Sequence, residues 1–593
     1  MFRRSLIALA ICSPLIMSTS GCSSTTPVTH PAVKADNSTI SAVAQLTPQA
    51  LFSSEQALIN RATFDQMLLA IADPDSSNET LDTALYYLRA YSYFGDTKAL
   101  TTKEAQQLTA ALLALSENKT LNARLQEHFA VTIYRYYDNN DWSEQLAPLL
   151  PQLGQQLQTL GNSSSTTAND YALWETIRAY GLLFNKARKD TDGSLNALVT
   201  QDEVIQPLLS YTRNDSSIRQ QDDWAKANSY WALGLYRLAL PASDTDQPTA
   251  AEQAIDDATK EIALADIAIR GEQAKTTYTL GYHVNAFAGQ EACEQQTDVC
   301  AIPELETVLP IEHHCSDSLF ILAQDLNEQE LAISCEKLTS QESDFHELLE
   351  TNMQPTANDY NEALRVVAFK NWSQYNAYGQ LLFDIRTDNG GMYIEGTPSK
   401  PGNQATFFAF RQFWIEPEFA IWNLNHEYVH YLDGHFVKYG GFGHFPSKLV
   451  WWAEGLAEYI ANGNDNPSAL RVIKKKLAEA PDLATIFATE YKDGVDRTYR
   501  WSYMAIRFLA EHHRNDLVQL SKYLKTDYFE GYELLLEDLS AHQAQFAAWL
   551  QVQVDNFEDA EQDKPKINKI NRYAYRDYLM PAHLSINSQH QHY

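Results

Sequence analysis

The chain of 593 residues has few basic side chains, few cysteines and no long apolar run after its first twenty residues. Lysine and arginine total 45 against 76 aspartate and glutamate residues, so the net charge is −31 at pH 7. A chain this acidic cannot hold a nucleic-acid backbone by neutralising its phosphates, which excludes nucleic acid as a partner. Because it also lacks further apolar runs of about 18 residues, it is not a protein that crosses a membrane several times.

The length and the composition indicate several packed domains. At about 100–200 residues per domain, a chain of this length is expected to form two or three. Hydrophobic residues make up 45% of the chain and aromatic residues 11%, which is enough apolar material for packed cores and excludes disorder over most of the length.

Residues 1–21 are predicted to be an export signal. Two arginines precede an apolar stretch, residues 6–17, that is too short to span a membrane stably. The ending at Cys22, preceded by serine and glycine, resembles the bacterial lipobox, in which the cysteine is lipidated and becomes the mature N-terminus. We therefore expect an outer-membrane or cell-surface lipoprotein whose membrane contact is this lipid alone. The alternative is ordinary signal-peptidase cleavage and a secreted chain.

The remaining chain is predicted to divide into four segments. Residues 22–50, with the lipidated cysteine, are rich in Ser, Thr, Pro and Ala and are typical of a flexible tether. Residues 51–275 carry apolar and aromatic positions three and four apart, in segments that recur about every 40–55 residues. This predicts an all-α array of helical hairpins with its tyrosine stripes in the core. Residues 276–553 are expected to form an α+β domain, and residues 554–593 a polar tail.

The second large segment contains the strand candidates. Short apolar runs predict strands at residues 364–369, 381–385, 392–395 and 405–410. An Asp-Asn-Gly-Gly cluster before the third run is a turn signal. Helices are expected to return from Pro417, since proline suits the first position of a helix.

Four cysteines remain after the signal and the lipidated residue, and an even number in an exported chain predicts two disulfides. Three connectivities are possible. Short loops close most easily, which favours the pairs Cys293–Cys300 and Cys315–Cys335. A zinc site is the rival interpretation, but the spacings of six and nineteen intervening residues do not suit it.

The segment HEYVH, residues 426–430, is the strongest functional signal. On a helix, His426 and His430 lie on one face, one turn apart, where both imidazoles can reach one Zn²⁺ at about 2.0–2.1 Å. Glu427 projects about 100° away around the helix. There it can accept a proton from zinc-bound water and deliver it to a leaving amine. The pattern therefore predicts a zinc peptidase site.

A third ligand is expected on a later helix. The metzincin pattern would continue with a glycine and a histidine, but those positions hold Asp433 and Phe436. Glu454 lies in the otherwise apolar segment 449–460, where a buried carboxylate is costly without a cation. Glu458, one turn further, is expected to accept a hydrogen bond from a ligand imidazole. Spacing alone allows these two glutamates to exchange roles.

Two segments, HEYVHYLDG at 426–434 and WWAEGLAEY at 451–459, together resemble the microbial collagenase family of gluzincin metallopeptidases. Residues 388–395 are similar to that family's active-site edge strand. The resemblance covers the catalytic part closely, and the helical part is similar in kind to the family's activator domain. It implies a thermolysin-like α+β peptidase domain and a zinc endopeptidase that hydrolyses collagen-like or gelatin-like polypeptides.

Carried over by motif, the resemblance assigns the zinc ligands to His426, His430 and Glu454 and the general base to Glu427. The Glu-Gly pair in the second motif places the ligand at 454 rather than at 458. The substrate would bind as an added strand along the edge strand. The edge-strand positions are Gly390, Gly391, Met392 and Tyr393.

Other roles stay open. Gluzincins often place a phenol beside the oxyanion, and Tyr499 and Tyr503 are the candidates here, with core packing as the alternative for both. Family members often bind calcium, and Ca²⁺ stays open as a second metal although the chain has no calcium-loop motif.

The sequence also departs from the family pattern. His435 stands where family members commonly have arginine, and no accessory collagen-binding module follows the peptidase segment. We therefore expect peptide hydrolysis but no efficient attack on insoluble fibrils. The chain is also expected to be a monomer. A general zinc peptidase without collagen preference is one alternative, and an inert surface-binding lipoprotein is another.

Overall fold

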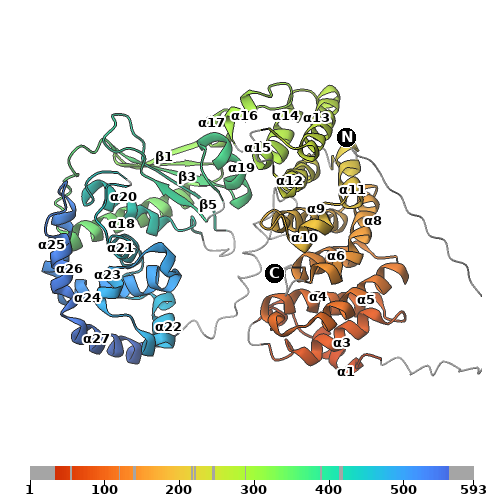
Figure 1. Ribbon diagram of the computed structural model, residues 1–593, viewed down its shortest axis with the longest axis horizontal. Coiled ribbons are helices and arrows are strands. Elements are labelled where there is room, and N and C mark those ends of the chain that lie inside the picture. The colour runs from red at the N-terminus through yellow and green to blue at the C-terminus, as the bar shows by residue number, and fades with distance from the viewer. Residues whose placement is uncertain are drawn as a thin grey trace, which may run out of the picture.

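The computed structural model describes residues 34–559, apart from 54–55, 119, 138–141, 215–217, 220–221, 243–246, 288, 388–389, 413–418 and 442. The predicted signal, the lipidated Cys22, the turn at 388–389, Pro417 and most of the tail lie outside the described residues. Figure 1 shows a helical first part of the chain and a second part that holds the sheet, as two bodies joined in the region of α19 (Trp372–Phe383).

The first body is built from short and medium helices. They are α1 (Asn37–Ala44), α2 (Pro48–Leu51), α3 (Arg61–Ala72), α4 (Asn78–Phe94), α5 (Thr102–Asn118), α6 (Ala123–Tyr136), α7 (Ser143–Leu146), α8 (Leu150–Gly161), α9 (Thr167–Ala187), α10 (Ser194–Val199), α11 (Asp202–Arg213), α12 (Trp224–Ala239), α13 (Ala250–Arg270), α14 (Gln273–Tyr278), α15 (Val284–Phe287) and α16 (Gln290–Glu294). The short helix α17 (Leu305–Val308) follows and packs in a small core with strands of the sheet.

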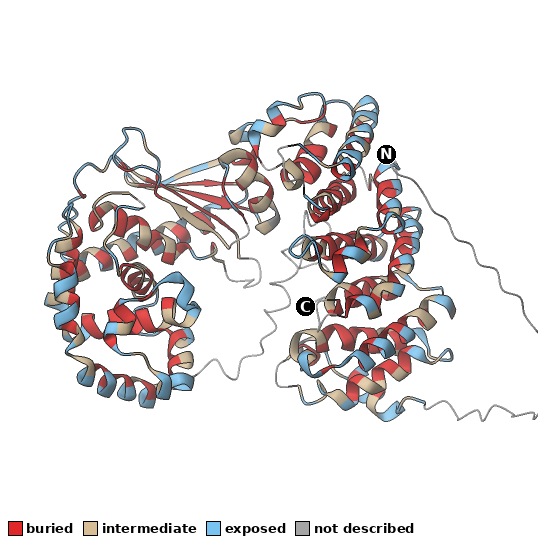
Figure 2. Ribbon diagram, in the orientation of Figure 1, coloured by how far each residue is buried: buried red, intermediate tan, exposed pale blue. Residues whose placement is uncertain are grey.

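Local sequence signals begin these helices and aromatic side chains pack them. Ser77 and Thr166 accept a hydrogen bond from a backbone N–H in the first turn of α4 and α9, which satisfies a donor that the helix leaves unpaired. Helices α4, α6, α9 and α12 pack in a row, each against the next. The tyrosine stripes lie inside this row, with Tyr87, Tyr180 and Tyr230 fully buried. The predicted core role of the tyrosines is confirmed, and Figure 2 shows the buried residues along the row.

The first hydrophobic core continues past the predicted boundary at residue 275. It includes Cys293 and Cys300, and it also takes in Ala377 and Leu381 from α19. Helix α19 therefore packs against both bodies, and it is the structural link between them.

A five-stranded mixed sheet lies in the second body. Its strands are β1 (Ile311–Ser316), β2 (Leu319–Ala323), β3 (Leu364–Phe369), β4 (Met392–Ile394) and β5 (Thr406–Phe410). The order is β1-β2-β3-β5-β4, with β2, β3 and β5 parallel and the outer strands β1 and β4 antiparallel to their neighbours. The predicted strands at 364–369, 392–395 and 405–410 are confirmed. The predicted strand at 381–385 is wrong, because its first three residues end α19. A five-residue apolar run does not distinguish a strand from the end of a buried helix.

Besides α19, the helices of the second body are α18 (Glu328–Leu349), α20 (Leu424–Phe436), α21 (Val450–Asn462), α22 (Pro467–Lys476), α23 (Leu483–Phe487), α24 (Ser502–His512), α25 (Arg514–Leu524), α26 (Tyr532–Ser540) and α27 (Gln543–Asn556). Of these helices, α18, α19 and α20 contact the sheet, and most of the others pack against further helices.

Alternate residues of β3 belong to different cores, as a strand buried on both faces requires. Val366 packs in the core that contains α18, α20, α21 and α24, and Val367 packs in the smaller core with α19. The helix that carries the HEYVH segment begins at Leu424, later than the predicted start at 417. None of the described helices combines the length and the apolar character needed to span a membrane.

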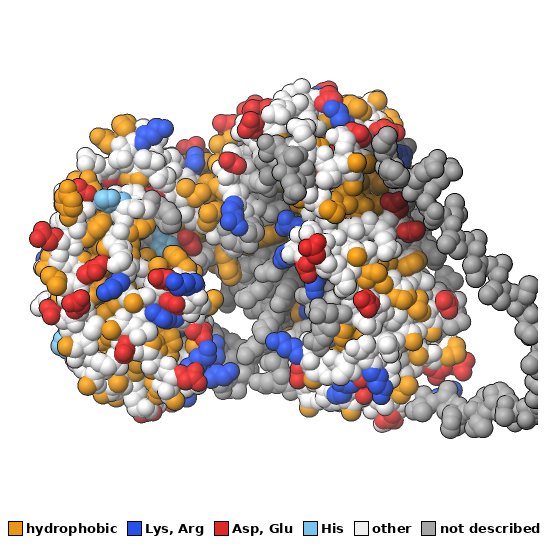
Figure 3. Space-filling view, in the orientation of Figure 1, with side chains coloured by type: hydrophobic (Ala, Val, Ile, Leu, Met, Phe, Trp, Pro, Cys, Tyr) orange, Lys and Arg blue, Asp and Glu red, His pale blue; other side chains and the backbone are white. Residues whose placement is uncertain are grey.

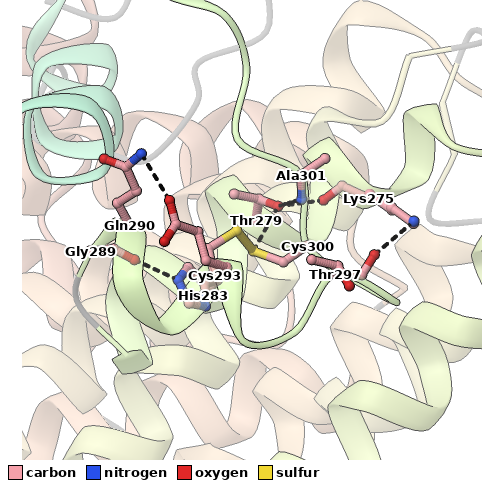
Figure 4. Close-up of a disulfide and its surroundings, with 10 residues drawn as sticks. Lys275, Thr279, His283, Gly289, Gln290, Cys293, Thr297, Cys300 and Ala301 are labelled. Carbon is pink, nitrogen blue, oxygen red and sulfur yellow. Dashed lines mark hydrogen bonds between the residues drawn. A yellow bond between two sulfur atoms is a disulfide. The ribbon is translucent and has the colours of Figure 1, made fainter.

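The predicted disulfide pairing is confirmed. Cys293 and Cys300 are joined across a short loop with their Cα atoms 5.5 Å apart (Figure 4), and Cys315 and Cys335 with theirs 5.2 Å apart. The second bond ties β1 to α18, which packs against α20. It therefore fixes the sheet to the helix that supports the HEYVH segment.

Buried charges connect three helices of the first body. The Arg89 guanidinium lies 3.1 Å from Glu127 Oε1 and 3.4 Å from Glu175 Oε1. Glu175 also accepts hydrogen bonds from Arg178 and from the Tyr134 hydroxyl, both at 3.0 Å. These charged side chains are at most 5% exposed, so each depends on the others for compensation.

We predict that Glu175→Gln lowers the free energy of unfolding of the first body by about 3 kcal/mol, because two buried guanidinium groups then face a single carboxylate. Urea unfolding of the full chain, followed by tryptophan fluorescence, measures the change. The control is Glu261→Gln, which removes the exposed partner of Arg213 and should cost less than about 1 kcal/mol. Equal losses in the two variants would contradict the prediction.

Candidate active site

Helices α20 and α21 bring the predicted metal ligands together. His426 and His430, one turn apart on α20, direct their Nε2 atoms to within 3.1 Å of each other. Glu454 reaches them from the neighbouring helix α21, with Oε2 3.1 Å from His426 Nε2 and 3.6 Å from His430 Nε2. The predicted set of ligand residues therefore converges on one point.

The separations among these three atoms fit a zinc ion. Three ligands at about 2.0–2.1 Å from a tetrahedral metal lie about 3.3–3.4 Å from one another. The observed separations of 3.1, 3.1 and 3.6 Å bracket this value. Two imidazole nitrogens and one carboxylate oxygen are also the donor set of many catalytic zinc sites, which leave one position for water or substrate.

Gly455 allows α21 to pack so that Glu454 lies beside the two histidines. A Cβ atom on Gly455 would lie 2.6 Å from the carbonyl oxygen of Ser502, closer than real contacts allow. The absence of a side chain lets α24 pack directly against α21 on the side away from the histidines. The Glu-Gly pair of the motif thus has a packing reason, because the residue after Glu454 must have no side chain.

The electrostatics of the cluster favour a cation. Burial by itself would lower the pKa of His426, but the hydrogen bond with Glu454 and the nearby Glu458 outweigh it and raise the pKa to about 10. Burial would raise the pKa of Glu454, but the charges of His430 and His426 and their hydrogen bonds hold it well below its ordinary value. Positive charge is therefore stabilised where the three ligand atoms meet.

Glu458 lies on the far side of the His426 ring. Its Oε1 atom is 3.3 Å from His426 Nδ1, and its Oε2 atom accepts hydrogen bonds at 3.0 Å from Asn466 and from Arg500. A carboxylate in this position favours the tautomer that carries the proton on Nδ1 and leaves Nε2 free to ligate. Glu458 is therefore near enough to His426 for its predicted role, which stays a prediction, whereas Glu454 is the glutamate that meets the two Nε2 atoms.

Glu427 points into the same cavity from α20 and is half-buried. The side-chain amide of Asn423 donates a hydrogen bond to its Oε1 atom at 2.8 Å. Asn423 precedes the helix with φ 54°, a left-handed conformation that asparagine tolerates better than most residues. The turn that begins α20 therefore also orients the predicted base.

The two tyrosine candidates lie in different surroundings. Tyr499 lines the cavity, with its ring centroid 6.0 Å from that of His426. Tyr503 is fully buried, and its hydroxyl donates to the carbonyl oxygen of Gly463 at 2.9 Å. Only the first of the two is placed to meet a substrate.

The sequence analysis missed Tyr491. Its side chain is 60% exposed, but its hydroxyl reaches inward and donates to Glu454 Oε1 at 2.7 Å. This bond occupies the carboxylate oxygen that does not face the histidines, and it favours ligation through Oε2 alone. Tyr491 stands in a short surface turn 37 positions after the ligand, where no periodic pattern marks it.

The cavity beside the cluster has a volume of about 880 Å³ and is bounded by β4, α20, α21 and the turn that carries Tyr491. The predicted edge-strand residues Gly391, Met392 and Tyr393 line it, and β4 stands last in the sheet order. A Cβ atom on Gly390 would lie 2.3 Å from the indole nitrogen of Trp422, and Gly391 has φ 138°. The turn before β4 therefore requires glycine at both positions. A side chain at Gly390 would collide with Trp422, and the φ of Gly391 is one that other residues rarely adopt.

Comparison with known proteins matches this part of the chain. Residues 263–549 match the collagenase family model. A microbial collagenase of Vibrio alginolyticus is 42% identical over 252 residues, which are 42% of this chain and 31% of that protein. A microbial collagenase of Vibrio vulnificus is 38% identical over 246 residues, 41% of this chain and 30% of that protein. Collagenase ColT of Clostridium tetani is 26% identical over 213 residues, 33% of this chain and 20% of that protein.

The matched region thus spans less than a third of the length of these relatives. The region that matches the family model, residues 263–549, contains both helices of the candidate site and the sheet beside them. The resemblance to microbial collagenases is therefore confirmed for the second body of the chain.

We predict that Glu458→Gln weakens zinc binding by about 10- to 100-fold, because the partner that orients the His426 ring loses its charge. Competition with a chromogenic zinc chelator measures the affinity. The matched control is Glu537→Gln on the exposed face of α26, which should bind zinc like the unchanged protein. An affinity of Glu458→Gln within twofold of the control would contradict the prediction.

Proposed function

We propose that the chain is a zinc endopeptidase that hydrolyses collagen-like or gelatin-like polypeptides, because residues 263–549 match the collagenase family model. The observation that carries the proposal is the convergence of His426, His430 and Glu454 on one point beside a cavity that also contains Glu427. This cavity is large enough to receive several residues of an extended peptide.

A zinc ion held by the three ligands would polarise the scissile carbonyl and make a water molecule more acidic. Glu427 then acts as the general base. Asn423 holds one of its carboxylate oxygens at 2.8 Å, so that the other can accept the proton of the attacking water. The same carboxylic acid delivers this proton to the leaving amine, which completes the hydrolysis without a covalent intermediate.

Tyr499 is proposed to stabilise the oxyanion. Burial, together with the charges of Glu454 and Glu427, raises the pKa of Tyr499 to about 12. The phenol therefore keeps its proton at neutral pH and can donate a hydrogen bond to the charge that develops on the substrate carbonyl. The substrate is proposed to lie along Gly390, Gly391, Met392 and Tyr393 as an added strand.

The proposal also covers the cellular location of the protein and the role of the first body. We propose export, with a lipid on Cys22 and the segment 22–50 as a tether, or release after cleavage. The helical first body, predicted at 51–275, is proposed to act like an activator domain that faces a polypeptide substrate held by the peptidase domain. A monomer is sufficient for this arrangement, and calcium remains a proposed second ion.

Glu427→Gln should lower kcat by about 10²- to 10⁴-fold and keep stoichiometric zinc, because it removes the base but no ligand. A fluorogenic Gly-Pro-rich peptide measures turnover, and atomic absorption measures the metal. Glu537→Gln again serves as the matched control.

A gelatin gel assay with the same proteins tests the activity itself. Clearing by the unchanged chain should disappear with a zinc chelator and return with added zinc. An inert binding lipoprotein would clear no gelatin under any condition. Cleavage of a peptide library mainly at apolar sites, without Gly-Pro preference, would identify a general peptidase instead.

Tyr499→Phe should lower kcat by about 100-fold with little change in KM, because its hydroxyl is used in the transition state. Tyr503→Phe is the matched control, since its hydroxyl bonds the Gly463 carbonyl inside the core. Steady-state kinetics on the fluorogenic peptide separates the two variants. A Tyr499→Phe enzyme with unchanged kcat would refute the oxyanion role.

A further inference from the structure

A lysine in the wall of the cavity is not used by the proposed mechanism. Lys438 stands two residues after the end of α20 and lines the cavity together with Phe445. We propose that Lys438 binds a carboxylate group of the substrate and so determines specificity at one position of the bound peptide. This inference rests on the proposed peptidase function, and it adds a recognition element to the same site.

Two neighbours hold the ammonium group in place. The Nζ atom lies 4.6 Å from the centre of the Phe445 ring, within the range of a cation–π interaction. It also lies 3.8 Å from Asp433 Oδ2. The Lys438 side chain is 12% exposed and that of Asp433 is 1% exposed, so the position of the charge is well defined.

These contacts fix the charge but do not use its hydrogen-bond donors. A separation of 3.8 Å is too long for a hydrogen bond. Within the described part of the chain, Asp433 Oδ2 has no hydrogen-bond partner, while Oδ1 accepts from the Trp452 indole at 3.0 Å. The ammonium group therefore keeps donor capacity for an acceptor that enters the cavity.

The other charged groups of the cavity explain why this site would be selective. Arg500 also lines the cavity, but its guanidinium donates to Glu458 at 3.0 Å. The acidic residues of the lining are Glu395, Glu427, Glu454 and Glu458. Apart from the point where the predicted metal ligands meet, an acidic group of the substrate would be repelled by these carboxylates and attracted beside Lys438.

The ligand class is a carboxylate, from either of two sources. It can be the side chain of a glutamate or aspartate within the peptide, or the C-terminal carboxylate of a short peptide. A charge-assisted hydrogen bond in a partly buried cavity accounts for a preference of roughly tenfold over the neutral amide.

Two peptide series test the inference and separate the sources. The first carries Glu or Gln at each position in turn in an amidated Gly-Pro-Ala background. The second keeps the neutral sequence and has a free or an amidated C-terminus. Ratios of kcat/KM within each pair are compared for the unchanged chain, Lys438→Met and Lys474→Met. The last is the matched control, an exposed lysine of α22 whose Nζ lies 5.8 Å from the centre of the Phe557 ring.

We expect a roughly tenfold preference for the carboxylate at one position in the unchanged chain and in Lys474→Met, and a ratio near one in Lys438→Met. A preference in the first series assigns the site to an internal acidic side chain, and one in the second series assigns it to the C-terminus. Equal ratios in all three proteins would overturn the inference.

The same peptide pairs are also titrated by calorimetry into two zinc-loaded proteins. One carries Glu427→Gln alone, and the other carries Glu427→Gln together with Lys438→Met. Binding constants in this background test carboxylate recognition without turnover. If the unchanged chain cleaves no peptide, the proposed function fails, while a Lys438-dependent tenfold difference in Kd still supports the carboxylate site. The absence of that difference overturns the inference whether or not peptides are cleaved.

Discussion

The second body depends on the contact between α20 and α21, where a buried carboxylate faces two imidazoles. Removing Glu454 from water is costly, and the cost is offset only because positive charge is held at the same point. The contact is supported from both sides. Gly455 lets α24 pack closely behind α21, and Trp452 bonds Asp433 of α20 through its indole. The ligand geometry is thus a consequence of how two helices pack, and it does not require flexible loops.

The rest of the second body keeps α20 in place and gives it a partner strand. Helix α18 packs against it and is tied to β1 by the bond between Cys315 and Cys335. On its other side, β4 lines the cavity at the end of the sheet order. The two glycines before β4 allow the chain to pass close to Trp422 as it enters this strand. Two helices carry the three predicted ligands, and the exposed turn at Tyr491 adds a hydrogen bond to one of them.

The sequence predicted the features that have a strict period or a strict chemical requirement. The two histidines four residues apart, the glutamate in an apolar helix and the local disulfides are of this kind, and the structure brings each set together. It did not predict features that depend on tertiary context. The run at 381–385 ends a helix because α19 packs between two cores, and Tyr491 reaches the site from a turn with no periodic signal. The predicted domain boundaries remain predictions, although the first core extends to Cys300.

The net negative charge of the chain explains why the arrangement around Lys438 matters for binding an acidic substrate group. A net charge of −31 disfavours the approach of acidic polypeptides, and this effect is spread over the surface and screened by salt. On the face that Figure 3 shows, acidic and basic side chains are interspersed over both bodies. Recognition of a carboxylate therefore needs a cation held inside a partly dry cavity, where screening is weak. Asp433 and Phe445 hold such a cation in place, so a repulsive overall field and an attractive position apart from the metal cluster together select where an acidic group can bind.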